Sequence, residues 1–344
     1  MKQSKYDLKK ICTGVVLFFF VYGGLVLLIS RERIGASRLG YGGAAVVFAA
    51  AVLLLAAYGA WIVRCDKTGR KSFGLYAIRT VEKYQFLIEQ LVTRDFKIKY
   101  KRSVLGVFWS FLNPLLMMVV QYMVFSNLMK FETPHYAIYL LTGIVMFSGF
   151  NDCCNQALRA IIGNATLITK VYVPKYIYPI TKVLSASINM VLSMVPLLLV
   201  TLVYGLTSDT HLYLNASILL IPVALALLII FTIGMGFLLS SLMVFFHDVE
   251  FLWGVLSTMW MYATPIIYPI SIFQGKEDFL SRFMLGVIQV NPLYHYIEFM
   301  RSIIISGCSP ALSEYLICAA WSFGMLAVGA FVFKKTQDKF ILYI

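Results

Sequence analysis

The chain has 344 residues, of which 60% are hydrophobic and 13% charged, and its formal net charge is +13. Soluble domains carry about 45–50% apolar and about 25% charged residues, so this composition excludes an ordinary water-soluble globular protein. Apolar runs of about 20 residues, without the alternating pattern of barrel strands, indicate membrane-spanning helices. We therefore predict an all-α membrane protein.

Apolar windows predict eight spans in chain order. They cover residues 11–30, 41–63, 104–128, 137–158, 177–204, 216–245, 249–268 and 311–333. The first follows a lysine-rich start, as a signal peptide would. Its apolar run is too long for a signal peptide and no A-x-A cleavage site follows, so we expect a retained anchor.

Most of the 29 lysine and arginine residues fall in segments that share one side of the membrane if the eight spans are correct. Segment 64–103 is the richest, and the N-terminus, 159–182 and the C-terminal tail add to it. The positive-inside rule places these segments, with both termini, on the cytoplasmic side of the plasma membrane.

Residues 76–103 form a basic segment that leads directly into a predicted span. Within it Tyr84, Leu87 and Leu91 recur at helical spacing, with charged residues mainly on the other side. This pattern predicts an amphipathic helix in the membrane interface, held by apolar burial and by attraction to anionic lipid. An ordinary solvated connector is the alternative.

Residues 264–306 lie outside the cytoplasm by the charge pattern and are interrupted by Pro265, Pro269 and Pro292. Broken apolar segments at a membrane face predict short re-entrant helices, packed in protein or lining a wet cavity. Such helices could form a gate, whereas a folded surface cap is the alternative.

Three parts follow from these patterns. Residues 1–75 form a two-helix transmembrane extension, 76–103 the amphipathic interface helix, and 104–344 a six-helix transmembrane body.

Sequence motifs for catalysis are missing. The chain contains no GxxxxGK[ST] phosphate loop, no HExxH and no GxSxG, and none of its six cysteines forms a CxxC pair. We predict neither a catalytic nor a metal site. Asp152, Asp248 and Glu250 are the acidic residues that an enzyme at the membrane face could use, and nothing groups them.

Five motifs occur in order between residues 80 and 344. They are the basic segment 91–106 with Trp109 and Asn113-Pro114, the turn 164–175, the stretch 246–250, the aromatic segment 260–269, and Asn291-Pro292 with Glu298, Arg301 and the terminal 339–344. Together they resemble the ABC-2 type permeases that export polysaccharides, with teichoic acid and O-antigen exporters as the nearest branch. One departure is His247 before Asp248, where the family often carries arginine.

The resemblance implies a transport subunit rather than an enzyme. It would work as a homodimer with two copies of a separate ATPase subunit, which would bind the ATP and Mg. The substrate would be a polyprenyl-diphosphate-linked polymer. The subunit would also contact membrane lipid, and it would bind no nucleic acid. The residues expected to contact the ATPase are Asn164, Lys170, Tyr172, Pro174, Lys175 and Asp248.

Further residue roles follow from the same resemblance. The lipid diphosphate, or equally bulk anionic lipid, would meet Arg94, Lys97, Lys99, Lys101 and Arg102. Aromatic surfaces for sugar rings would be Trp109, Tyr122, Trp253, Trp260, Tyr262 and Tyr268. The external gate would use Pro265, Pro269, Asn291, Pro292, Glu298 and Arg301.

Two other functions stay open at this point. One is a permease of the same fold that exports a drug or a lipid, and the other is a membrane-embedded enzyme of cell-envelope synthesis.

Overall fold

The computed structural model describes residues 8–29, 40–68, 73–129, 135–171, 173–207, 216–274 and 278–344. Within these ranges the regular structure is entirely helical and comprises twelve α-helices with short 3-10 turns. Six of the described helical segments are long and apolar enough to cross a membrane. The prediction of an all-α, multi-pass membrane protein is thereby confirmed.

The chain divides into two compact units. The first comprises Met1–Gln90 with Cys308–Leu312, and the second Leu91–Gly307 with Ser313–Ile344. The division falls inside helix α4 (Phe73–Tyr100), between the predicted boundaries after residues 75 and 103. The assignment of three functional parts stays a prediction.

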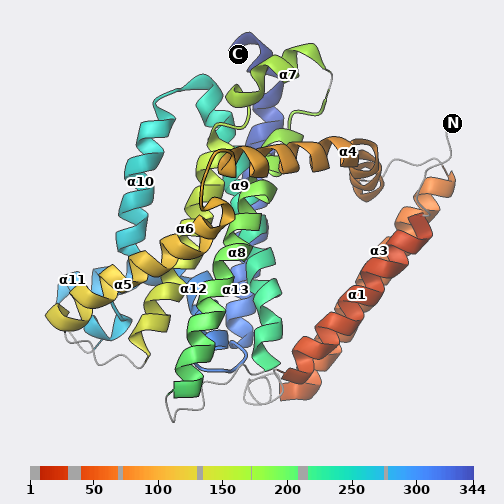
Figure 1. The fold of residues 1–344 in the computed structure, drawn as a ribbon. Coiled ribbons are helices and arrows are strands. Elements are labelled where there is room, and N and C mark those ends of the chain that lie inside the picture. The colour runs from red at the N-terminus through yellow and green to blue at the C-terminus, as the bar shows by residue number, and fades with distance from the viewer. Residues whose placement is uncertain are drawn as a thin grey trace. The chain divides into compact units, whose positions relative to one another are not determined.

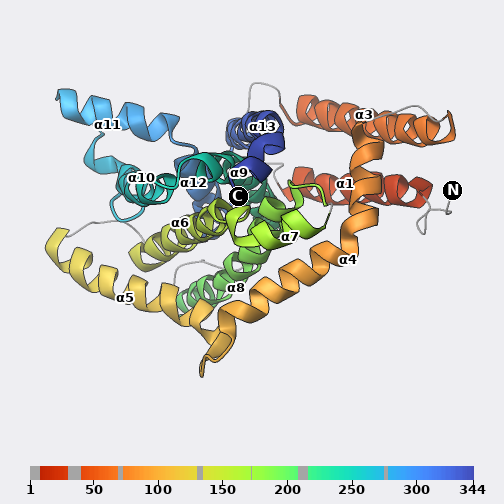
Figure 2. The same ribbon diagram turned by 90° about the horizontal axis from the view of Figure 1, so that it is seen from above.

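The first unit is built on a hairpin of α1 (Leu8–Ile29) and α3 (Gly40–Thr68), which lie side by side in Figures 1 and 2. An apolar cluster at one end of the hairpin comprises Leu8, Ile62, Cys65 and Leu75. Segment Leu8–Val26 is one of the six candidate spans. Several α3 side chains lie outside the described residues, so the span over 41–63 stays a prediction.

Five long helices form the second unit and match predicted spans. They are α5 (Trp109–Met129), α6 (Tyr136–Leu158), α8 (Ile177–Thr207), α9 (Ile221–Phe245) and α13 (Leu312–Thr336). Helix α6 lies at the centre, packed against α5, α8, α9 and the short α12 (Pro292–Ile304), as Figure 2 shows from above. Cys153 and Ala157 of α6 are fully buried against Val183 and Ala186 of α8.

Helix α10 (Val249–Ala263) is shorter than the predicted span over 249–268. Its 15 residues rise about 22 Å, less than the ~30 Å of a bilayer core. The helix stops because Thr264 precedes Pro265, and a residue before proline is pushed out of the helical conformation. Thr264 accordingly has an extended backbone, with φ −98° and ψ 132°.

Short elements complete the second unit. They are η1 (Gly106–Phe108), η2 (Ile162–Asn164), α7 (Ala165–Lys170), η3 (Ala216–Leu220), η4 (Ile270–Ile272), α11 (Phe279–Val290) and η5 (Gln337–Leu342). Helices α11 and α12 have 12 and 13 residues. The predicted break of 264–306 into short helices is therefore confirmed, while their place outside the cytoplasm stays a prediction.

Two glycines let α9 and α13 approach closely. A Cβ atom added to Gly329 would overlap the carbonyl oxygen of Gly234. Small residues at such crossings allow backbones to meet, which is a common basis of helix packing in membranes. Gly324, on the same helix, has open space where a Cβ would be.

We predict that Gly329→Ala lowers stability by about 1–3 kcal/mol, because the added methyl group forces the two backbones apart. Gly324→Ala is the matched control and should stabilise α13 by about 0.5–1 kcal/mol through helix propensity. Thermal unfolding of the purified protein in detergent measures both. Equal melting temperatures for the two variants would contradict the close approach.

Candidate functional site

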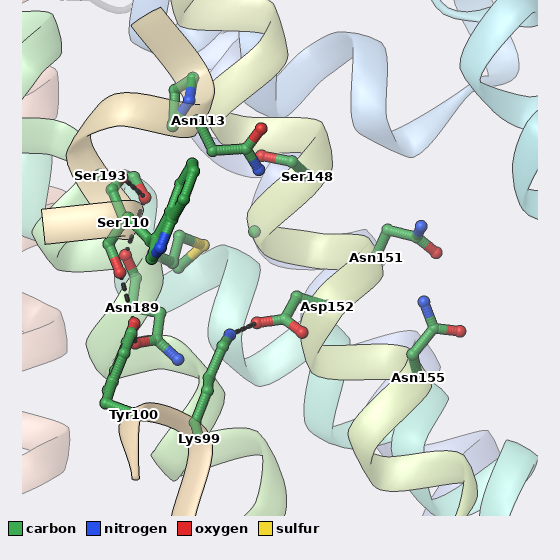
Figure 3. A pocket seen from close by; sticks show the side chains of 14 residues that line it. Lys99, Tyr100, Ser110, Asn113, Ser148, Asn151, Asp152, Asn155, Asn189 and Ser193 are labelled. Carbon is green, nitrogen blue, oxygen red and sulfur yellow. Dashed lines mark hydrogen bonds and ion pairs between the residues drawn. The ribbon is translucent and has the colours of Figure 1, made fainter. Parts of the chain in front are cut away.

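A polar cavity of about 540 Å³ lies between the end of α4 and helices α5, α6 and α8 (Figure 3). We call it the asparagine cavity, because four of its lining side chains are asparagines. Its lining is Lys99, Tyr100, Trp109, Ser110, Asn113, Pro114, Ser148, Gly149, Asn151, Asp152, Asn155, Asn189, Met190 and Ser193. Polar residues inside apolar spans are costly and usually mark a function, so this cluster is the first candidate site.

One wall of the asparagine cavity is fixed by Tyr100, the last residue of α4. Its hydroxyl donates to Oδ1 of Asn189 on α8 at 2.6 Å and is also hydrogen-bonded to Oγ of Ser110 on α5. Ser193 of α8 donates to the Ser110 carbonyl oxygen at 3.0 Å. Three helices are therefore joined by hydrogen bonds around this wall.

The opposite wall carries the ion pair of the cavity. Lys99 Nζ lies 2.7 Å from Oδ2 of Asp152 on α6, and both side chains are partly exposed. Gln156, one turn further along α6, donates to the other carboxylate oxygen at 3.3 Å. The two charges compensate each other, so the ionisable lining has no net charge at neutral pH.

Further amide groups line the rest of the asparagine cavity. Asn151 and Asn155 lie one turn apart on α6, and Asn113 of α5 points toward Ser148 (Figure 3). The Oδ1 atom of Asn151 is buried and has no hydrogen-bond partner among the described residues. A buried amide oxygen without a partner costs about 1–3 kcal/mol.

A second cavity of about 170 Å³ continues from the asparagine cavity. The two share Asn113, Pro114 and Ser148 in their linings, and the second reaches Ile266 and Ile267 beyond the end of α10. The two cavities therefore follow one another along α5 and α6, from Lys99 to Ile266 and Ile267 in the broken segment 264–306.

A third, cationic pocket of about 570 Å³ lies on the other face of the α4 end. Its charged lining residues are Arg94, Lys97 and Lys101, and Tyr100 is common to this pocket and the asparagine cavity. Lys97 and Lys101 line this pocket, whereas Lys99 lines the asparagine cavity. The predicted cluster of cations is therefore divided between two sites.

The broken segment 264–306, which we call the outer segment after its predicted place, is held by a buried arginine. Arg301 of α12 is 3% exposed and donates to the carbonyl oxygens of Pro265 at 2.8 Å, Ile266 at 3.3 Å and Tyr139 at 3.3 Å. Its guanidinium also lies over the Tyr139 ring, 3.4 Å from the centroid. The bonds to Pro265 and Ile266 satisfy carbonyl groups that follow the end of α10, and the bond to Tyr139 ties this segment to α6.

Asn291 joins the outer helices to α10. Its Oδ1 accepts from the backbone N–H of Leu293 at 3.0 Å, which caps α12, and from Nε1 of Trp260 at 2.7 Å. Its Nδ2 donates to the Thr264 hydroxyl at 2.8 Å. Pro292 takes the first position of α12, where its missing N–H is harmless.

Comparison with known proteins identifies the family. The sequence model of the family described as "ABC-2 type transporter" matches residues 87–305, which is more than half of the chain. The chain belongs to the ABC-2 type transporter family. It is therefore a transporter membrane subunit and not itself a catalyst, as the motifs predicted.

Named relatives of this ABC-2 subunit are exporter proteins. The chain is 27% identical over 263 residues to the "O-antigen export system permease protein RfbA" of Myxococcus xanthus, covering 76% of this chain and 97% of that protein. It is 27% identical to the RfbA protein of Klebsiella pneumoniae, with 74% and 93% covered. It is 25% identical to the "Capsule polysaccharide export inner-membrane protein BexB" of Haemophilus influenzae, with 50% and 63% covered.

The structure separates the predicted channel aromatics into different environments. Only Trp109 lines the asparagine cavity. Trp253 is buried and, with Trp260, packs against Phe150 of α6. The remaining three lie toward the outer ends: Tyr122 packs on Tyr136, Tyr262 is exposed, and Tyr268 donates to the Tyr262 carbonyl oxygen. Their role in transport stays a prediction.

The predicted gate residues gather around the outer segment. Pro265 accepts from Arg301, Pro269 precedes η4, and Asn291 and Pro292 form the start of α12. Glu298 lies one turn before Arg301 on the same helix. The structure therefore gives these residues a shared architectural role, while gating stays a prediction.

The predicted ATPase contacts divide into exposed and internally bonded residues. Lys170 and Asp248 are exposed. Asn164 is buried, and its amide bonds Arg94 at 3.1 Å and the Ala160 carbonyl oxygen at 2.8 Å. Tyr172 lies outside the described residues, and Pro174 is partly buried.

Arg102 of the predicted phosphate cluster is exposed in a left-handed turn, with φ 69°.

Lys175 binds the C-terminal tail. Its Nζ donates to the Gln337 carbonyl oxygen at 2.6 Å and lies 5.8 Å from the centroid of the Phe340 ring. Burial lowers the pKa of Lys175, and the nearby Asp338 carboxylate acts in the opposite direction. A contact with an ATPase through this ammonium group would have to replace the bond to the tail.

Sequence reasoning missed the polar side chains on α6 and α8. Asn151, Asn155, Asn189 and Ser193 belong to none of the five motifs. A signal was present, because asparagines four apart inside an apolar span share one helix face and are expensive in lipid. Asp152 was considered only for an enzyme, whereas the structure pairs it with Lys99.

We predict that Arg301→Lys lowers stability by at least about 2 kcal/mol, because a lysine cannot replace the fork of hydrogen bonds to three carbonyl groups. Arg282→Lys, at an exposed position of α11, is the control and should change stability little. Unfolding in detergent compares the two. An unchanged melting temperature for Arg301→Lys would show that the three bonds contribute nothing.

Proposed function

We propose that this chain exports a lipid-linked polysaccharide of the O-antigen or capsule type across the cytoplasmic membrane, driven by a separate ATPase subunit. The observation that carries this proposal is the asparagine cavity between the end of α4 and helices α5, α6 and α8, in a member of the ABC-2 family. Amides and hydroxyls suit a hydrophilic polymer better than a drug or a lipid, which would need an apolar lining. The names of the relatives agree with this substrate class.

The working unit is a homodimer with two ATPase subunits, which bind the ATP and Mg. In the single chain the path opens at the surface, since Trp109 is 46% and Met117 49% exposed although both line it. A second copy facing this side would close the channel and shield these apolar surfaces. This arrangement is supported by family membership.

Both termini lie in the cytoplasm, following the distribution of basic residues. Helix α4 then lies in the cytoplasmic interface, and α11 and α12 re-enter the membrane from the outer face. The two helices of the first unit are additional spans, since the family match begins only at residue 87.

The ATPase drives transport through α7 and the turn that follows it. This six-residue helix ends at the exposed Lys170 and connects α6 to α8 through the 164–175 turn. A short, basic connection between two spans that line the path can transmit rigid-body movement from a cytoplasmic partner.

Loss of this chain in its own host should remove the polymer from the cell surface, and the wild-type chain should restore it. We expect Lys170→Glu to restore less than a tenth of the surface polymer, because charge reversal opposes the contact with the ATPase. Lys170→Arg keeps the charge and should restore export. Surface polymer and the ATPase rate of the purified complex are the measurements.

Normal surface polymer in the strain without this chain would refute the proposed function. Normal coupling in Lys170→Glu would refute only the role of α7 in contacting the ATPase.

A further inference from the structure

We infer that the asparagine cavity accepts an uncharged stretch of the glycan, while an anionic group, such as the phosphates of a lipid-linked end, is held outside it in the cationic pocket. This inference rests on the proposed function and narrows its substrate to polymers whose repeats carry no phosphate. A teichoic-acid-like polyol phosphate is thereby excluded.

Charge compensation inside the asparagine cavity disfavours an anionic polymer. Lys99 is its one cationic side chain, and the 2.7 Å ion pair with Asp152 already neutralises it. A phosphate entering here would have to break that pair and would then face the free Asp152 carboxylate. Like charges at such distances repel strongly in a partly buried site, so an anionic repeat is disfavoured.

The remaining lining suits sugar hydroxyls. Asn113, Asn151 and Asn155 each present an amide that can both donate and accept, as a hydroxyl can. Trp109 is 46% exposed and offers an apolar surface beside these amides.

The second cavity is uncharged as well. Its polar lining consists of Asn113, Gln121 and Ser148, and none of its lining residues is charged. A polymer with a phosphate in every repeat would find no cation in this cavity.

The cationic pocket offers cationic side chains for a phosphate, which the two cavities do not. Lys97 and Lys101 line it together with Arg94, whose guanidinium is already paired with Asp95, and Tyr100 lines both this pocket and the asparagine cavity. Lys97 and Lys101 are exposed and form no ion pair within the described part of the chain. Clustered cations bind phosphate, so the charged and uncharged parts of one substrate would lie on the two sides of Tyr100.

Photo-crosslinking in the exporting host tests this division. The amino acid p-benzoylphenylalanine is placed at Asn155 in the asparagine cavity, at Lys97 in the cationic pocket, or at Phe323 as control, a 57% exposed residue of α13 that lines neither site. After irradiation the purified chain is analysed for covalently bound sugar and phosphate. Only variants that still export the polymer are compared.

We expect at least a ten-fold higher sugar yield at Asn155 than at Phe323, with a sugar-to-phosphate ratio well above that at Lys97. Phosphate in every repeat of the material bound at Asn155 would overturn the inference and leave the proposed function standing. Sugar at Asn155 no higher than at Phe323, in a strain that exports normally, would also overturn it. Absence of any export defect in the deletion strain would instead refute the proposed function.

Discussion

The half of this structure that contains segment 264–306 depends on how the chain leaves the helical conformation in a membrane. Carbonyl groups released at such a break have no water to bond, so the protein must supply donors. Arg301 does so for the segment after α10, and its planar fork reaches α6 as well. Because Ile266 also lines the second cavity, the same bonds fix the outer end of the proposed path.

Polar contacts link α4, α8 and the segment before α7 in a comparable way. Asp95 pairs with Arg94 at 2.9 Å and with Lys182 of α8 at 2.9 Å, and Arg94 also bonds Asn164, just before α7. The helix that carries these residues ends at Tyr100, which forms the wall between the asparagine cavity and the cationic pocket. We therefore expect movement of α7 to displace Tyr100, because side chains in direct contact connect the two.

Much of this architecture could be predicted because apolar length determines a span. Helices α6 and α8 begin within one residue of their predicted starts, and the prolines marked the broken outer segment. The site was harder to predict, because contacts between helices determine which side chains line it and which charges are paired. Spacing along one segment grouped Lys99 with its basic neighbours, but only packing against Asp152 shows that its charge is compensated. Likewise, Asn164 matched a motif, whereas its burial reflects the neighbouring Arg94.

The central claim, that the polymer passes through the asparagine cavity, is tested most directly by protection of a cysteine placed there. Asn155→Cys, in a background with Cys12 and Cys308 replaced by serine, is labelled with a membrane-impermeant maleimide in inside-out vesicles that contain the ATPase. The account predicts that lipid-linked polymer stalled in the transporter slows labelling at least several-fold, while Lys335→Cys at the end of α13 labels at an unchanged rate. Equal labelling of Asn155→Cys with and without stalled polymer would contradict it.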